Sequence, residues 1–298
     1  MTSSITIVTA FFDIGRGNWT TENGYSPYFH RTSQTYLDYF KNLATLENDM
    51  VIFTSKEFED KIRKIRGERP TKIIVMNPVK RLIKLREKIK KIQDSDKFKS
   101  LLNKEQSISP EYFSPDYILV CNLKSYFVSK AINLELVKTE SVAWVDFGYC
   151  RDLKTLNNIV RWDYHFPEEK INFFTIKKGL KVNSLDDVFD KMLNNDVYII
   201  GGAIVGKKEK WNEFSRLVWA CQRLTLKRKM IDDDQGIFIM CYYKRNDLIK
   251  LNYLGKNNWF YLFKKYNHSQ LMLWYIKIKL IIFSKLGNNT ENKKSLNS

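Results

Sequence analysis

The stretch Ser141-Val-Ala-Trp-Val-Asp-Phe-Gly-Tyr149 decides the fold class, because a short apolar run ends there in a carboxylate, Asp146, with Gly148 two residues on. A short apolar run bounded by turn residues is typical of a buried strand. In an open α/β sheet, ligands bind at the carboxyl ends of the strands, and a glycine there lets the backbone approach a phosphate. The stretch therefore predicts an α/β protein with a ligand site at Asp146.

Local chemistry offers two other interpretations of Asp146. An aspartate after an apolar run also forms turns or caps the next helix. The tripeptide Asp146-Phe-Gly148 also matches the metal-binding tripeptide of protein kinases. A kinase needs a glycine-rich loop, a strand lysine and a His-Arg-Asp loop upstream, and the chain has none of these. The kinase interpretation is excluded, whereas the turn and cap interpretations stay open.

Composition narrows the class of protein. The 298 residues suffice for one large domain or two small ones, and 44% hydrophobic residues with 14% aromatic residues are typical of a globular protein. A net charge of +17 attracts polyanions, which include nucleic acid, anionic membranes and phosphorylated substrates. The N-terminus lacks the pattern of a signal peptide, and the four cysteines form no Cys-x-x-Cys pair. We therefore expect a cytoplasmic protein without a disulfide framework.

Further apolar runs predict an alternating α/β chain. Residues 5–12, 50–54 and 72–76 predict strands, and the basic stretch 56–69 predicts a helix. Strands that alternate with helices predict a mainly parallel sheet. The loop Asp13-Ile-Gly-Arg-Gly17 after the first strand carries a G-x-G without the third glycine of a dinucleotide fingerprint, so by itself it is a weak motif.

Two predicted helices carry basic residues. Residues 79–93 have one apolar face surrounded by lysines and arginines, a pattern that favours a solvated helix surface over a binding surface. A second helix, at residues 124–132, comes just before the strand that ends at Asp146. We expect Asn122 or Lys124, at the start of this helix, to face a ligand.

The second half of the chain adds a glycine pair and an acidic run. Residues 196–206 predict a strand interrupted by Gly201 and Gly202, and glycine inside a strand usually marks a close approach of backbone or ligand. The three aspartates at 232–234 repel one another, so they need a helix N-terminus, a cation or solvent to tolerate them. Acidic sites and a glycine pair at the ends of α/β elements together favour a nucleotide-dependent transferase.

Four stretches resemble one known family: Thr9-Ala-Phe-Phe-Asp-Ile-Gly-Arg-Gly17, Trp144-Val-Asp-Phe-Gly-Tyr149, Ile200-Gly-Gly-Ala-Ile-Val-Gly206 and Asp233-Asp-Gln-Gly-Ile237. In this order they resemble the HtrL/YibB-like family of bacterial surface-polysaccharide proteins, to which the WlaTB-type lipooligosaccharide proteins are similar. The resemblance spans residues 5–267. It implies a glycosyltransferase of the GT-A type, a single α/β domain with a mainly parallel central sheet flanked by helices. It also implies a nucleoside-diphosphate donor, such as a UDP-sugar, and a lipooligosaccharide, lipopolysaccharide or capsule acceptor, either lipid-linked or an oligosaccharide.

The resemblance also implies site residues. In such enzymes a D-x-D motif after a central strand holds Mn²⁺ or Mg²⁺ against the donor diphosphate. Asp146-Phe-Gly148 keeps the first acid and lacks the second, so Asp146 is implied as a ligand of the ribose or of the metal. GT-A enzymes often recruit a late histidine to the metal, which makes His268 the candidate. The acid before the last helix is represented by Asp233 or Asp234, either of which would act as the general base.

The remaining expected contacts are with the donor and the acceptor. Gly201, Gly202 and Gln235 are expected beside the donor sugar and acceptor. The first strand and its loop are expected to hold the base and the diphosphate, through aromatic stacking and an arginine that pairs with phosphate. The expected donor-binding residues are Thr9, Ala10, Phe11, Asp13, Arg16, Asn122, Lys124, Asp146 and Gly148.

Residues 268–298 are expected to form a basic amphipathic segment with a disordered end. The aromatic and aliphatic run 271–283 is too short, and too interrupted by Lys277 and Lys279, to span a bilayer. It is expected either to lie on an anionic inner membrane surface or to pack on the domain. Two other functional classes stay in view. Nucleic-acid binding is not expected because no known binding signature is present, whereas a noncatalytic assembly protein is permitted by the missing second acid.

Overall fold

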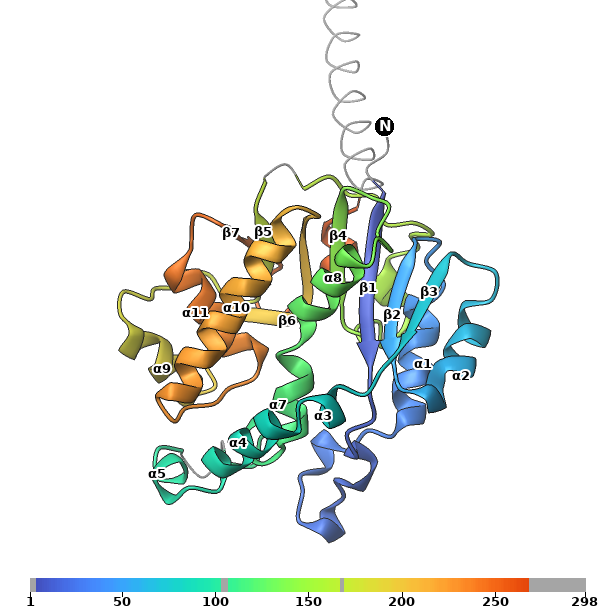
Figure 1. Ribbon diagram of the computed structural model, residues 1–298. Coiled ribbons are helices and arrows are strands. Elements are labelled where there is room, and N and C mark those ends of the chain that lie inside the picture. Colours follow the sequence, from blue (N-terminus) through green and yellow to red (C-terminus); the bar gives the residue numbers. More distant parts are fainter. Residues whose placement is uncertain (1–3, 103–106, 167–168, 268–298) are drawn as a thin grey trace, which may run out of the picture.

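A seven-stranded sheet forms the centre of the molecule in the computed structural model, which describes residues 4–102, 107–166 and 169–267 (Figure 1). The strand order is β3-β2-β1-β4-β6-β5-β7. The strands are β1 (Ile5–Phe11), β2 (Met50–Thr54), β3 (Thr71–Val75), β4 (Ser141–Val145), β5 (Ile171–Thr175), β6 (Ile199–Lys207) and β7 (Ile249–Tyr253).

The sheet is mainly parallel. Strand β1 lies parallel to β2 and β4, β2 lies parallel to β3, and β5 lies parallel to β7. Only β6 runs against its neighbours β4 and β5. The prediction of an α/β fold with a mainly parallel sheet flanked by helices is thereby confirmed.

Alternate residues of each central strand pack on opposite faces of the sheet, because successive side chains of a strand point to opposite sides. On one face, Val8 of β1 packs in a core with Phe127 and Trp211, which come from α8 (Lys124–Asn133) and α10 (Lys210–Lys227). On the other face, Ile7 packs with Phe40 of α1 (Ser33–Leu43), and α2 (Lys56–Arg66) contributes to the same core. Burial on both faces explains why these strands are apolar runs.

The remaining helices of the described chain lie around this sheet (Figure 1). In Figure 1 the arrow of β1 points toward the side where α3, α4 and α7 lie. These helices are α3 (Pro78–Arg81), α4 (Ile83–Gln93), α5 (Asp96–Lys99), α6 (Pro110–Phe113), α7 (Pro115–Cys121), α9 (Leu185–Leu193), α11 (Asp234–Lys244) and α12 (Leu262–Lys265). Helix α11 packs against α9, α10 and β6.

Three local predictions need correction. The helix expected at residues 79–93 is two helices, because Leu82 leaves helical geometry with φ −112° and ψ 30°. The strand expected at 196–206 begins at Ile199 and runs through both glycines. Strands β5 and β7 were not predicted at all, since β5 carries Asn172 and β7 alternates apolar residues with Lys250 and Asn252.

The glycine pair lies at an irregularity of the sheet. Strand β6 keeps continuous pairing with β4, but against β5 the register jumps from Ile204 opposite Phe173 to Ile200 opposite Phe174. The residues between Ile200 and Ile204 therefore have no partner on β5. Such bulges occur preferentially beside active sites, where they redirect the chain. This bulge faces the cavity described next.

Candidate active site

A cavity of about 600 Å³ lies at the carboxyl ends of β1 and β4. This volume falls within the range of small-molecule sites. Its wall includes the end of β1 (Ala10 to Asp13), the segment after β4 (Asp146 to Tyr149), the bulge of β6 and the start of α11. The predicted location, at the carboxyl end of the Asp146 strand, thus coincides with a cavity.

The floor of this cavity is formed by Lys124, Asp146, Asp233 and Asp234, and Lys124 contacts two of these acids. Its side chain is 8% exposed, and its Nζ lies 2.9 Å from Asp146 Oδ1 and 2.8 Å from Asp234 Oδ2. The same ammonium donates a hydrogen bond of 2.9 Å to the carbonyl of Gly201. Burial lowers the pKa of Lys124, but the two carboxylates together outweigh this effect and hold the pKa above the ordinary lysine value. The lysine therefore stays charged and joins three separate elements.

Asp146 takes its orientation from its own strand. Its backbone N–H donates to the Gly202 carbonyl at 2.9 Å, which continues the ladder between β4 and β6. The indole Nε1 of Trp144 donates to Asp146 Oδ1 at 2.7 Å. The Asp146 side chain is still 38% exposed. Lys124 donates to the other oxygen, Oδ2, at 3.2 Å, so both carboxylate oxygens meet protein donors while the side chain stays partly open to the cavity.

The acidic run at 232–234 forms the N-terminus of α11, as one of the sequence alternatives proposed. Asp233 is the N-cap, and its Oδ1 accepts the backbone N–H of Gln235 at 2.9 Å. All three aspartates are buried, so solvation does not separate their charges. Burial raises the pKa of Asp233 well above its usual range, and the neighbouring Asp234 and Glu111 raise it further. Asp233 therefore holds its proton more tightly than an ordinary carboxyl group does.

Glycine is required beside Asp234. A Cβ added to Gly201 would lie 1.6 Å from Asp234 Oδ2, a distance at which two atoms cannot coexist. A Cβ at Gly202 would lie 3.0 Å from the ring of Tyr149 and 3.7 Å from Asp146 Oδ2. The glycine pair was predicted to leave room for sugars. At Gly201 the structure gives that room to the Asp234 carboxylate, although both glycines line the cavity.

Three arginines that are half-buried or exposed line the cavity without a carboxylate partner among the described residues. They form what we call the rim of the cavity. Arg16 donates to the hydroxyl of Tyr36 at 2.6 Å and twice to the carbonyl of Phe29. The guanidinium of Arg31 lies 5.6 Å from the ring centre of Tyr28, and that of Arg151 lies 4.5 Å from that of Phe260. Within the described parts of the chain, no acid forms an ion pair with any of the three. Their charge is therefore available to an anionic ligand.

Aromatic side chains accompany these arginines. Tyr36 and Tyr39 of α1 both line the cavity, with ring centres 6.5 Å apart, and Trp259 and Phe260 line it from the segment after β7. Aromatic faces offer stacking surface to rings and cations. Phe11, which was expected to stack on a base, is instead enclosed by Phe58 and Phe147, at centre distances of 4.8 and 5.0 Å.

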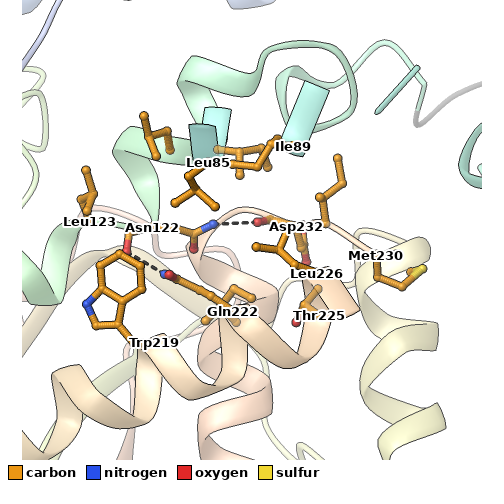
Figure 2. A pocket seen from close by; sticks show the side chains of 14 residues that line it. Leu85, Ile89, Asn122, Leu123, Trp219, Gln222, Thr225, Leu226, Met230 and Asp232 are labelled. Carbon is orange, nitrogen blue, oxygen red and sulfur yellow. Dashed lines mark hydrogen bonds between the residues drawn. The ribbon is translucent and has the colours of Figure 1, made fainter. Parts of the chain in front are cut away.

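A second, much smaller cavity of about 30 Å³ lies behind the acidic run (Figure 2). Figure 2 shows Asn122 donating its amide N–H to the Asp232 carbonyl, at 3.0 Å, while Gln222 donates to the Asn122 carbonyl at 2.8 Å. Asn122 therefore supports the backbone ahead of α11 and does not line the large cavity. The expectation that Asn122 faces the donor is corrected accordingly.

The other predicted residues fall into three groups. Thr9 is fully buried and lies outside the lining of the large cavity, so its expected donor contact is also corrected. His268 and the segment 268–298 lie outside the described residues. The predicted residues that do line the cavity are Ala10, Phe11, Asp13, Arg16, Lys124, Asp146, Gly148, Gly201, Gly202, Asp233, Asp234 and Gln235.

Sequence reasoning missed several lining residues, among them Glu111, Arg31, Arg151 and Tyr36. Arg151 had one available signal, since it follows the predicted strand that ends at Asp146, whereas Arg31 lies near Tyr28 and Phe29 but follows no predicted element. Glu111 gave none, because it comes from the short helix α6. Burial raises the pKa of the Glu111 carboxyl to about 7.

The described residues do not fit a divalent metal ion. In nucleotide sites Mg²⁺ is usually bound through one or two carboxylates together with phosphate oxygens and waters, and those carboxylate oxygens must face the ion. Asp146 and Asp234 point their oxygens at the ammonium of Lys124, which already occupies the space between them. Over residues 4–102, 107–166 and 169–267, no group of three histidine, cysteine or acidic side chains could hold a metal. The expected role of Asp146 as a metal ligand is therefore not supported by the donor set.

None of the helices described is long and apolar enough to cross a membrane. The described cysteines are all free thiols, as their spacing predicted.

Comparison with known proteins identifies the family. A family model described as "Bacterial protein of unknown function (HtrL_YibB)" matches residues 3–268. Protein HtrL of Escherichia coli (strain K12) is 51% identical over 271 residues, which cover 91% of this chain and 95% of that protein. The chain belongs to the HtrL_YibB family, and the resemblance inferred from its four stretches is confirmed.

Some solved structures match the chain at lower similarity. Mouse xyloside xylosyltransferase 1 in its apo form has a TM-score of 0.41 at 12% identity, over 83% of this chain and 84% of that one. The inositol-1-phosphate CTP transferase from T. maritima has a TM-score of 0.38 at 11% identity, over 85% and 86%. The 4-diphosphocytidyl-2C-methyl-D-erythritol synthase from Anaerococcus prevotii DSM 20548 has a TM-score of 0.35 at 11% identity, over 84% and 87%.

Proposed function

We propose that this member of the HtrL_YibB family is a glycosyltransferase that moves a sugar from a nucleoside-diphosphate donor, such as a UDP-sugar, to a saccharide acceptor. The observation that carries the proposal is the division of charge in the cavity. Carboxyl groups of Asp146, Asp233 and Asp234 gather at its floor, while Arg16 and Arg31 line it without an acidic partner among the described residues. Such a cavity suits a ligand with an anionic diphosphate at one end and a neutral, hydroxyl-rich sugar at the other.

The arginines would bind the diphosphate. A guanidinium presents several N–H donors in one plane, which matches phosphate oxygens, and Arg16 and Arg31 both lie near Tyr36. Negative charge grows on the leaving diphosphate during transfer, so fixed cations stabilise the transition state more than the ground state. Aromatic rings beside the arginines offer stacking surface for the base or for sugar rings.

Asp233 is the carboxylate that we assign as general base in a direct displacement. Its raised pKa makes it a stronger base than an ordinary aspartate when it is ionised. Asp234 is less suited, because its carboxylate is held by Lys124. In the proposed step the acceptor oxygen bonds to the anomeric carbon, the bond from that carbon to the phosphate oxygen breaks, and the acceptor proton moves to Asp233. The nucleoside diphosphate leaves with the electron pair.

Asp233→Asn tests this assignment. The variant should lower kcat by two orders of magnitude or more and change donor affinity less than threefold, because a base acts only in the transition state. Asp186→Asn, on the exposed side of α9, is the matched control and should keep full turnover. Lost donor affinity with unchanged kcat would identify the acidic run as structural.

We further propose a cytoplasmic protein whose aromatic and aliphatic run 271–283, set between lysines, contacts the anionic inner membrane surface, where lipid-linked acceptors are assembled. The support is sequence alone, since this run lies outside the described residues. Replacing Lys277 and Lys279 by glutamate in the full chain should reduce sedimentation with anionic liposomes at low salt and leave donor binding unchanged. Equal sedimentation of both proteins would remove the membrane from the proposal.

A further inference from the structure

Lys124 is the most constrained charged residue of the cavity. Its Nζ meets Asp146 at the end of β4, Asp234 at the start of α11 and the Gly201 carbonyl in the bulge of β6. A lysine ammonium has three N–H donors and no acceptor. Protein oxygens from three segments therefore enclose the ammonium, two of them in ion pairs and one in a hydrogen bond.

The contacts of Lys124 are similar to some of those that a bound metal ion makes. A divalent cation in a nucleotide site neutralises protein carboxylates on one side and binds phosphate oxygens on the other. In this cavity the two tasks are divided. Lys124 lies between the carboxyl groups of Asp146 and Asp234 and offsets one of their two negative charges, whereas Arg16 and Arg31 have no acidic partner in the part of the chain that the structure describes.

The bulge of β6 gives independent evidence that the arrangement is built for the lysine. Gly201 presents its carbonyl to Lys124, and the same residue must lack a Cβ because Asp234 Oδ2 would lie 1.6 Å from it. One glycine thus supplies both an acceptor for the ammonium and the space for its second carboxylate. The floor of the cavity thus already contains one cation, the ammonium of Lys124.

We propose that Lys124 takes the place of a divalent cation as the positioning residue of this site, so that a nucleoside diphosphate binds without added metal. The inference rests on the proposed function, since it concerns how the donor of that reaction is held. Lys124 acts through Asp146 and Asp234, which it holds in place. It does not itself contact the reacting atoms.

Calorimetric titration of the full chain with uridine, cytidine, adenosine and guanosine diphosphates tests the proposal. Each titration is run in EDTA and again with Mn²⁺ premixed with the nucleotide. We expect at least one nucleotide to bind in EDTA with a Kd within threefold of its value in Mn²⁺. Binding in Mn²⁺ alone would overturn the role of Lys124 and leave the proposed function standing. Absence of binding in both conditions would overturn the proposed function as well.

A substitution gives a second readout that does not depend on activity. Lys124→Met removes the ammonium and leaves two carboxylates facing one another, so this variant should bind Mn²⁺ at least tenfold more tightly than the unchanged protein, as measured by electron paramagnetic resonance. Lys130→Met, on the same helix and outside the large cavity, should leave Mn²⁺ affinity unchanged. Tight Mn²⁺ binding by the unchanged protein, equal to that of Lys124→Met, would show that the lysine does not occupy the cation position.

Discussion

Two regions of the cavity differ in how their charges are satisfied. At the floor, Lys124 forms ion pairs with Asp146 and Asp234 inside the protein, with N–O distances of 2.8 to 2.9 Å. At the rim, Arg16, Arg31 and Arg151 pack on aromatic rings and meet no carboxylate among the described residues. The contrast teaches that the floor holds the fold and the catalytic geometry, whereas the rim provides charge for a ligand. Floor substitutions should therefore alter stability, and rim substitutions should alter binding and its salt dependence.

Removal of Lys124 should have the largest effect. Lys124→Ala leaves the buried Asp234 carboxyl group without its cation, and breaking a buried ion pair in this way costs about 3 to 5 kcal/mol of unfolding free energy. Lys41→Ala is the control, because Lys41 pairs with Asp38 on the exposed surface, where a pair contributes roughly 0 to 1 kcal/mol. Urea denaturation measures both. Equal losses for the two variants would remove the distinction between floor and surface.

Glu111 differs from the ion-paired acids at the floor, because it is a buried acid of the cavity wall without a cation partner in the described chain. Burial raises its pKa from 4.5 to about 7, so the folded protein binds a proton that the unfolded chain has already released. Stability should therefore fall as the pH rises through this window, by roughly 3 kcal/mol in total. Glu111→Gln should lack this loss.

The measurement is the free energy of unfolding of both proteins at several values between pH 4.5 and pH 7. The difference between Glu111→Gln and the unchanged protein should grow in favour of the variant as the pH rises. Parallel curves would mean that the Glu111 carboxyl titrates normally in the folded state.

Gly201 tests the geometry of the floor without changing a charge. Gly201→Ala forces Asp234 away from its position and should cost about 1 to 3 kcal/mol, as overpacking of a buried site does. Gly17→Ala is the matched control, because a Cβ there meets nothing closer than 3.7 Å. Thermal unfolding compares the two variants. An unchanged Tm for Gly201→Ala would mean that the site tolerates a displaced Asp234.

A rim substitution should have the smallest effect on stability and a clear effect on binding. Arg31→Gln should raise the Kd of a nucleoside diphosphate about tenfold, or roughly 1.4 kcal/mol, and weaken the dependence of binding on salt. Arg63→Gln, on α2 and outside the cavity, should leave the Kd unchanged. A Kd that shifts equally in both variants would indicate a general effect of net charge.

The sequence predicted the parts of the fold that rest on local patterns. The apolar run before Asp146 and the strand at Met50–Thr54 depend on neighbouring residues and were identified, and a helix N-terminus was one of three alternatives given for the acidic run. The reversed direction of β6 and the existence of β5 and β7 depend on pairing between distant segments. No local pattern encodes such pairing.

The dependence on distant pairing also explains which site residues could be predicted from the sequence. Asp146, Asp233 and Asp234 were predicted because each lies at the end of an element, but the lysine between two of them was placed only through a loose expectation that Lys124 faces a ligand. Thr9 and Asn122 were placed wrongly, since strand direction and helix rotation decide which side chains face the cavity. Strand direction and helix rotation are set by packing against distant segments, so the local sequence does not specify them.

Release of nucleoside diphosphate from a panel of nucleotide sugars, with saccharide acceptors present, measures the proposed glycosyl transfer itself. The account predicts that the unchanged protein releases one nucleoside diphosphate together with a glycosylated acceptor. Asp146→Asn, which keeps the shape of a side chain at the floor, should keep its circular dichroism and lose this release by at least two orders of magnitude. Equal release by Asp146→Asn, or no release from any nucleotide sugar, would contradict the assignment of this cavity as a glycosyltransferase site.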